Sequence, residues 1–354
     1  MSIRVPSLSR DLLQEEIHGL LARLGEGRVD GVAYDTAWVA RLAPRYPGYG
    51  FDAALEWLRR NQYEDGTWGG PLLHYHDRFI STLAAIIALR EVGRHPRDER
   101  RVKRGEDALW KIVGRLGRDD SDTVGFPALS ASLAQEAASL GLDVPQPPAR
   151  YAKAYQAKLE GFLAQTNRNW RESSLTVSFE AIRSLRRDGE DVFSGNHSVA
   201  TSPSATAGYL LDVADENALA YLQSVQDPQE GSFPAFAPID LFEVGWVLHH
   251  LRSVDAITPD QPEIRSLLEQ MFASWSPKTG VSHSRFYGAT DLDDTALCFS
   301  HLRWGGYPVD SQVFAYYETP HCFSCYLGET NPSVSVQVHL LNTLLEHDSH
   351  CRFV

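Results

Sequence analysis

The sequence predicts an all-α protein made of many antiparallel helices joined by short loops. Apolar residues recur along most of the 354 residues with the 3.6-residue period of an amphipathic helix. The alternating pattern that predicts a half-buried strand does not recur. Glycine, proline and aspartate gather between the periodic stretches, where they end helices and form turns.

The first expected helix carries a stripe of leucine and isoleucine between residues 12 and 24, and Gly25 ends it. Residues 80–92 are apolar on several faces, which predicts a helix that is buried all round. A polar stretch at 186–204 is the expected boundary between two domains. The remaining expected helices, in chain order, cover residues 51–60, 106–113, 129–140, 152–163, 175–185, 204–213, 216–223, 241–251, 264–275, 293–302 and 334–345.

Two segments show a weak internal repeat. Residues 58–69 and 222–233 each end a helix near a glutamine, pass through a glycine turn, and continue with a hydroxyl residue and an aromatic one. A glutamine side chain can bond the backbone groups left over at a helix end, and the aromatic ring can cover that bond. The repeat therefore predicts a tie between successive helices of a helical barrel.

Composition narrows the classes of function. A net charge of -13 repels phosphate backbones, so general nucleic-acid binding is not expected. Four cysteines do not make a disulfide framework in a chain of this length. The sequence shows neither a signal-peptide core nor an apolar run near the ~20 residues of a membrane span. We therefore expect a soluble cytoplasmic protein without integral membrane segments.

The sharpest chemical feature is the run Asp291-Leu292-Asp293-Asp294, which opens an expected helix. Aspartates in a first turn can simply cap the helix, since they bond its free N–H groups and complement its dipole. Alternatively, carboxylates this close cannot all ionise without a large cost, so one is held protonated and serves as a strong Brønsted acid. Such an acid beside an apolar cavity can protonate a carbon–carbon double bond.

A further interpretation of the run is the nucleophile loop of phosphatases similar to haloacid dehalogenases. That loop follows a hydrophobic strand, and residues 282–288 do not have the pattern of one. A second acidic metal motif does not follow in the sequence either. The sequence therefore disfavours a phosphatase.

Further short sequence motifs accompany the acidic run. They lie, in order, at residues 33–40, 65–69, 77–85, 123–126, 202–207, 238–243, 328–329 and 333–336. Tyr-Asp-Thr-Ala-Trp at 34–38 and the DxDD run are far more specific together than either is alone. In this combination the chain resembles class II terpene cyclases, specifically bacterial diterpene cyclases of the halimadienyl (tuberculosinyl) and copalyl diphosphate synthase type.

The resemblance implies two α/α-barrel domains, of the terpene cyclase β and γ types, with the active site between them. A helix within residues 1–30 would pack on the catalytic barrel. Residues 31–200 would form the γ-like barrel, and residues 201–354 a partial, β-like catalytic barrel that carries the DxDD run. Family members continue beyond the helix expected at 334–345, so the catalytic barrel is expected to be incomplete at its C-terminal side.

The resemblance also implies the chemistry. The substrate would be geranylgeranyl diphosphate, cyclised after protonation and with its diphosphate retained. Asp293 would donate the proton, with Asp291 and Asp294 as its supports. The aromatic residues expected to face the carbocation are Trp246, Phe242 and Phe236, because a π face attracts a cation; plain core packing is the alternative for each.

Mg²⁺ is the implied cofactor, held with the diphosphate at an acidic loop. The matching residues are Asp119, Asp120 and Asp122, for which a solvated loop is the alternative. Lys158 matches a basic position near the diphosphate, with an ordinary exposed helix lysine as its alternative.

Two departures from the family pattern concern the product. Val177 and Ala235 stand where copalyl-forming plant relatives carry the histidine and asparagine that hold a water for the final deprotonation. Neither side chain can act as a base or hold one, so hydride and methyl shifts can proceed. We expect a rearranged product of the halimadienyl or clerodane (kolavenyl) type. Copalyl diphosphate synthesis and a sesquiterpene (drimenyl-type) cyclisation are the alternatives.

A different class of function stays open as well: a truncated, non-catalytic or partner-dependent subunit, completed by a second copy or by a partner that supplies the missing helices. A squalene-type triterpene cyclase is disfavoured by the sparse repeats. His321, Cys322 and Cys325 give a weak zinc signal, since one CxxC without a second pair is usually a simple cysteine pair. His74 and His76 occupy a segment where relatives often carry an acidic residue in place of His76, and the sequence assigns this change no role.

Overall fold

The computed structural model describes residues 10–25, 29–119, 123, 125–164, 168–327, 329 and 333–353, and it confirms the predicted all-α class. Across these ranges the chain forms helices and loops, with β-structure limited to four isolated bridges. None of the helices described has the length and hydropathy that crossing a bilayer requires. The α-helices are α1 Arg10–Leu21, α2 Ala33–Ala40, α3 Asp52–Arg60, α4 Tyr75–Val92, α5 Asp98–Ile112, α6 Phe126–Ser139, α7 Ala149–Leu163, α8 Phe179–Ile182, α9 Pro203–Asp212, α10 Glu216–Val225, α11 Asp240–Ser253, α12 Pro262–Ala273, α13 Leu292–Trp304 and α14 Val334–His347.

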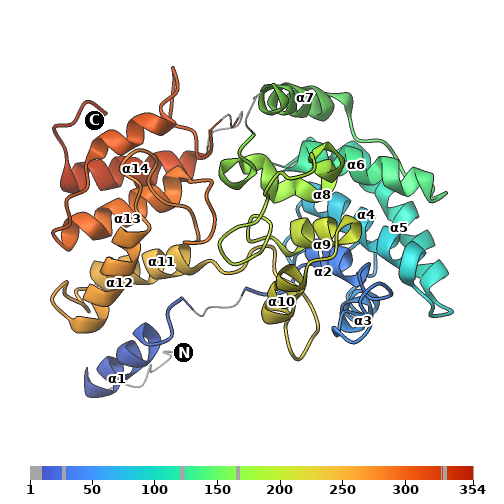
Figure 1. Cartoon of the computed structure of the whole chain (residues 1–354), viewed down its shortest axis with the longest axis horizontal. Coiled ribbons are helices and arrows are strands. Elements are labelled where there is room, and N and C mark those ends of the chain that lie inside the picture. The colour runs from blue at the N-terminus through green and yellow to red at the C-terminus, as the bar shows by residue number, and fades with distance from the viewer. Residues whose placement is uncertain are drawn as a thin grey trace, which may run out of the picture.

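The helices gather into two lobes, which Figure 1 shows side by side. The first lobe surrounds α4, whose residues from Phe79 to Leu89 are all buried, as its lack of a polar face predicts. The second lobe consists of α11 to α14 around a separate core that includes Leu248 and Phe299. Leu21 of α1 is buried in this second core, far along the chain from its partners.

The change from one core to the other lies later in the chain than the polar stretch at 186–204. Helices α9 and α10 follow that stretch, yet Ala207 and Leu222 belong to the first core. Side chains of the second core resume at Leu241. The reason is that α9 packs on α2 and on α8, so its apolar face is already covered in the first lobe.

The structure contains one helix that the sequence periodicity does not predict, and it breaks one predicted helix into shorter turns. The eight residues of α2 are buried on every side, so the sequence shows no amphipathic stripe there and the periodicity does not reveal this helix. Residues 175–185 form short 3₁₀ turns, Ser174–Ser178 and Arg183–Leu185, on either side of the four-residue helix α8. Ser173 caps the first of these turns by accepting from the N–H of Leu175, which favours a tight turn over a continuous helix.

The glutamine ties of the internal repeat are confirmed. The Gln62 side chain donates to the carbonyl oxygens of Gly66, at 3.0 Å, and of Arg101, at 2.9 Å, and so links the end of α3 to α5. In the second copy, Gln226 donates to the carbonyl oxygen of Gly50 at 3.1 Å. The aromatic residues of the two copies, Trp68 and Phe233, are fully buried.

A small junction joins the lobes. Ala200 of the first lobe is buried against Tyr287 and Ala289 of the second, and Val177 packs against this cluster. The junction also has polar contacts: Thr201 Oγ1 lies 2.9 Å from Nε2 of His283.

Inside the first lobe, two buried acidic residues tie α2 to α8 and α9. The hydroxyl of Tyr34 donates to Glu180 at 2.7 Å, and the N–H of Ser204 donates to Asp35 at 2.9 Å. Burial raises the pKa of the Glu180 carboxyl to about 7 and raises the pKa of Asp35 well above its usual value. Both carboxyl groups are therefore favoured in their neutral forms within the folded lobe.

Replacing Glu180 with Gln is expected to reduce the loss of stability between about pH 4.5 and 7. Because the folded pKa of Glu180 is raised, the folded protein retains in this range a proton that the unfolded chain has released, so the unfolding free energy falls as the pH rises. Urea unfolding at a series of pH values measures how steeply the unfolding free energy changes with pH. Glu172→Gln, an exposed position, should keep the wild-type slope, and an unchanged slope in Glu180→Gln would contradict the assignment.

Candidate active site

The acidic run begins α13, and its first residue is a helix cap. Asp291 is the N-cap, and its Oδ1 accepts from the N–H of Asp294 at 2.9 Å. Thr295, one turn into the helix, exchanges hydrogen bonds with the backbone of Val281, at 3.0 and 3.1 Å. Gly280 has a φ of +76° and lies against Thr295, where a Cβ would come within 2.2 Å of its side chain. Capping and a closely fitting loop thus fix the start of the helix.

Capping does not account for all of the carboxyl oxygens. Asp291 and Asp294 are 2% and 5% exposed, and Oδ2 of Asp291 and Oδ1 of Asp294 are buried without a hydrogen-bond partner in the described part of the chain. Burial raises the pKa of Asp291 to about 7, and burial with the nearby charge of Asp291 raises that of Asp294 well above its usual value. The pair therefore holds a proton near neutral pH.

Asp293 lies in a different environment from its two neighbours. Its side chain is 27% exposed, and its Oδ1 lies 2.5 Å from Nδ1 of His339 on α14. The His339 ring lies edge-on to Trp246 of α11, with centroids 5.1 Å apart. Three helices of the second lobe thus meet at Asp293, and sequence reasoning singled out only the acid and the tryptophan among these residues.

The expected aromatic residues fall into two groups. Phe242 lies beside Trp246 on α11, with ring centroids 6.2 Å apart, and Trp246 in turn contacts His339. Phe236 instead lies 5.4 Å from the ring of His283, near the junction of the lobes. Ala235 is half-buried next to Phe236.

His283 is a junction residue that the sequence reasoning missed, although it stands in the Ser-His-Ser segment before the acidic run. Burial lowers its pKa to about 4, so the imidazole is neutral at pH 7. Thr201 donates its hydroxyl to the carbonyl oxygen of Ala200, so it accepts from Nε2 of His283. Nδ1 lies 3.4 Å from Oγ of Ser282. Both ring nitrogens are thus engaged by the protein.

The structure describes the acidic loop proposed for Mg²⁺ only at Asp119, because Asp120 and Asp122 lie outside the described residues. The side chain of Lys158, the basic residue expected near the diphosphate, also lies outside them. Asp119 accepts from the N–H groups of Tyr75 at 3.0 Å and of His76 at 2.8 Å, and it thereby closes the N-terminal end of α4.

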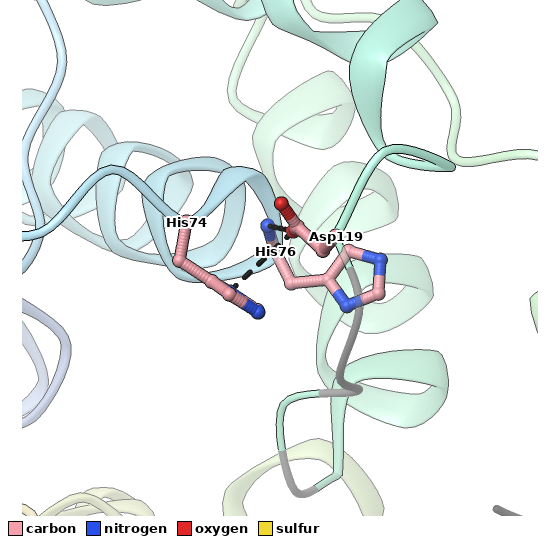
Figure 2. Close-up of side chains that lie close together, drawn as sticks. All are labelled: His74, His76 and Asp119. Carbon is pink, nitrogen blue, oxygen red and sulfur yellow. Dashed lines mark hydrogen bonds and ion pairs between the residues drawn. The ribbon is translucent and has the colours of Figure 1, made fainter.

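Among the described residues, the side chains that could share a metal ion with Asp119 are the imidazoles of His74 and His76 (Figure 2). These nitrogen ligands do not fit Mg²⁺, which prefers an octahedral shell of oxygen atoms. In the part of the chain that the structure describes, these three residues are also the single group of histidine, cysteine and acidic side chains within metal-ligand distance. The weak zinc signal at Cys322 and Cys325 therefore has no third ligand there.

Comparisons with known proteins place the chain's similarities among diterpene cyclases. The chain is 31% identical over 336 residues to an ent-copalyl diphosphate synthase from Arabidopsis thaliana, a match that covers 92% of this chain and 41% of the relative. It is also 31% identical over 336 residues to a (-)-kolavenyl diphosphate synthase from Tripterygium wilfordii, covering 90% of this chain and 40% of the relative. No protein-family model matches the chain.

Solved structures give the same result. The ent-copalyl diphosphate synthase from Streptomyces platensis matches with a TM-score of 0.74 at 27% identity, over 95% of this chain and 69% of that one. The Arabidopsis thaliana enzyme, solved with (S)-15-aza-14,15-dihydrogeranylgeranyl thiolodiphosphate, matches with a TM-score of 0.74 at 28% identity, over 95% and 49%. The chain is thus similar to class II diterpene cyclases in sequence and fold, and it spans about two fifths of the length of the curated relatives.

Proposed function

We propose that the chain cyclises geranylgeranyl diphosphate to a bicyclic diterpenyl diphosphate by protonating its terminal double bond. The observation that carries the proposal is the start of α13, where a buried carboxyl pair that retains a proton adjoins a half-buried aspartate in contact with a histidine. The relatives that make copalyl and kolavenyl diphosphates, and the geranylgeranyl analogue bound to the Arabidopsis enzyme, support the substrate class.

In this proposal Asp293 is the acid. Its proton moves from one carboxyl oxygen to the terminal alkene carbon, and the π electrons form the new C–H bond. The remaining tertiary cation is attacked by the next double bond, which closes the rings. Loss of one proton ends the sequence, so the reaction is an isomerisation and the diphosphate stays attached.

The neighbouring residues act on this acid in distinct ways. Nδ1–H of His339 donates to Oδ1 of Asp293 and stabilises the carboxylate that proton transfer leaves behind. The proton retained by the Asp291–Asp294 pair leaves one negative charge beside Asp293 instead of two. Trp246 presents an aromatic ring on the same side, where it can attract the cation.

Mg²⁺ enters the proposal through the family resemblance alone. The described residues around Asp119 do not fit it, so the mechanism assigns it no step.

The expected product is rearranged. Val177 packs at the junction of the lobes and Ala235 is half-buried near it, and neither carries a base. His283 is a weak base in this position, because burial lowers the pKa of its imidazole to about 4. Hydride and methyl groups can therefore migrate before the final proton is lost.

The test is to incubate the purified chain with geranylgeranyl and farnesyl diphosphates in separate reactions, remove the diphosphate with a phosphatase, and identify the alcohols by mass spectrometry. A halimadienyl or kolavenyl alcohol from the C20 substrate is the expected result. Unrearranged copalol as the main product would overturn the expected rearrangement, and drimenol from the C15 substrate alone would overturn the substrate.

One observation favours a second candidate, a subunit that acts only when a further segment covers α14. Four apolar side chains on this helix are exposed, by 78% at Val334, 57% at Val338, 48% at Leu341 and 54% at Leu345. Their spacing places them along one side of the helix. Specific activity that rises with protein concentration, together with dimers in sedimentation velocity, would identify a second copy as the cover; concentration-independent activity of a monomer would exclude this candidate.

A further inference from the structure

We propose that His74, His76 and Asp119 form a binding site for a divalent transition-metal ion such as Zn²⁺. Each residue offers one ligand atom, and these atoms lie within 4.8 Å of one another. Figure 2 shows the three residues close together at the N-terminal end of α4, where Asp119 contacts the ring of His74 and the backbone N–H of His76. The site lies in the first lobe, away from the acidic run, and it does not depend on the proposed cyclase activity.

The spacing of two ligand atoms already suits one ion. Nδ1 of His74 lies 3.4 Å from Oδ2 of Asp119. Two ligands held at 2.0–2.1 Å in a tetrahedral zinc site are about 3.3 Å apart. His74 has room to complete the approach, because its side chain is 29% exposed, while that of Asp119 is 5% exposed and held by two backbone N–H groups.

His76 is held in the form that a ligand needs. Its Nε2 lies 2.9 Å from the carbonyl oxygen of Leu116, which can only accept, and 2.8 Å from the hydroxyl of Tyr151, which itself donates to that carbonyl oxygen. With the hydrogen on Nε2, Nδ1 is the nitrogen that would bind the ion. The ring also stacks on Phe126, with centroids 4.0 Å apart and an interplanar angle of 15°. A hydrogen bond from the second ring nitrogen to a backbone carbonyl is the usual support of a metal-ligating histidine.

The ligand types select the class of metal. Two imidazoles and one carboxylate suit Zn²⁺, Co²⁺ or Ni²⁺, whereas Mg²⁺ prefers oxygen ligands alone. A hollow of about 400 Å³ reaches His76 and Asp119 and is also lined by Arg150 and Tyr151. It gives an ion access and leaves room for a water as the fourth ligand. Asp119 thus contributes a carboxylate from the acidic loop to a site whose other two ligands are histidine nitrogens.

The experiment uses Co²⁺ as a visible probe in the full chain with Cys322→Ser, Cys325→Ser and Cys351→Ser, so that the cysteines that are not buried cannot bind it. We expect one Co²⁺ per chain by equilibrium dialysis, with d–d absorption bands free of thiolate charge transfer. His74→Gln should weaken binding by at least about 10-fold. Glutamine keeps an acceptor for the N–H of Asp77 at the start of α4, so the fold should survive the change.

The matched control is His18→Gln on α1, a histidine whose side chain is 55% exposed and which should leave binding unchanged. Asp119→Asn, checked for folding by circular dichroism, should also lose the absorption bands. Wild-type affinity in His74→Gln would overturn the site. Displacement of Co²⁺ by an equal concentration of Mg²⁺ would overturn the assignment to a transition metal.

Discussion

Replacing Asp293 with Asn is expected to lower kcat for cyclisation by at least about 10³-fold, because an amide cannot supply the proton on which the reaction depends. The two side chains have nearly the same shape, so His339 still has an oxygen to donate to and the start of α13 is unchanged. Since Asp293 neither caps the helix nor belongs to the buried pair, folding stability should change little. Product formation under substrate saturation, with thermal unfolding measured alongside, tests both statements.

Asp260→Asn is the matched control, because that carboxyl is 90% exposed and lies far along the chain from the acidic run. It should retain wild-type kcat. If Asp293→Asn keeps more than a tenth of the wild-type rate while Asp294→Asn or Asp291→Asn does not, a member of the buried pair is the acid and the assignment to Asp293 is wrong.

The second large effect is expected at His339, a positioning residue that acts through Asp293. His339→Ala removes the contact at 2.5 Å, and we expect kcat to fall by about 10²-fold. His339→Asn restores a neutral N–H donor and should recover part of this loss. The loss should appear in kcat with little change in KM, because His339 contacts the acid that donates the proton.

A purely structural role for His339 would give a different outcome. It would lower the amount of folded protein without lowering kcat per folded molecule, and asparagine would not rescue it. His95→Asn provides the control, since this exposed histidine accepts from the N–H of Arg97 and lies in the other lobe. An unchanged kcat in folded His339→Ala would rule out the proposed contribution to proton transfer.

Sequence periodicity predicted those helices that have one polar and one apolar face. It also predicted the buried helix α4, because thirteen consecutive residues at 80–92 are mostly apolar. It could not predict α2, whose buried Asp35 and Thr36 interrupt the apolar pattern while the backbone N–H groups of distant residues donate hydrogen bonds to them. Long-range partners of this kind are not visible in a local window.

The same limit applies to the candidate site. Three aspartates at the start of α13 could be recognised because they are adjacent in sequence, and their crowding already indicated a retained proton. Which of them are buried could not be predicted, since this depends on the loops at Val281 and Cys325 that cover Asp291 and Leu292. His339 lies 46 residues beyond its partner, and only the packing of α14 on α13 brings it to Asp293.

The junction at Val177, Ala200 and Tyr287 has an evolutionary consequence. In the proposed mechanism the acid and its histidine belong wholly to the second lobe, whereas both lobes contribute the surface that would determine the product. Substitutions in the first lobe can therefore diversify the carbon skeleton across a lineage while the initiating chemistry is inherited intact. Substitutions that change the product would be expected mainly in the first lobe, whereas the residues that start the reaction would vary little in the second.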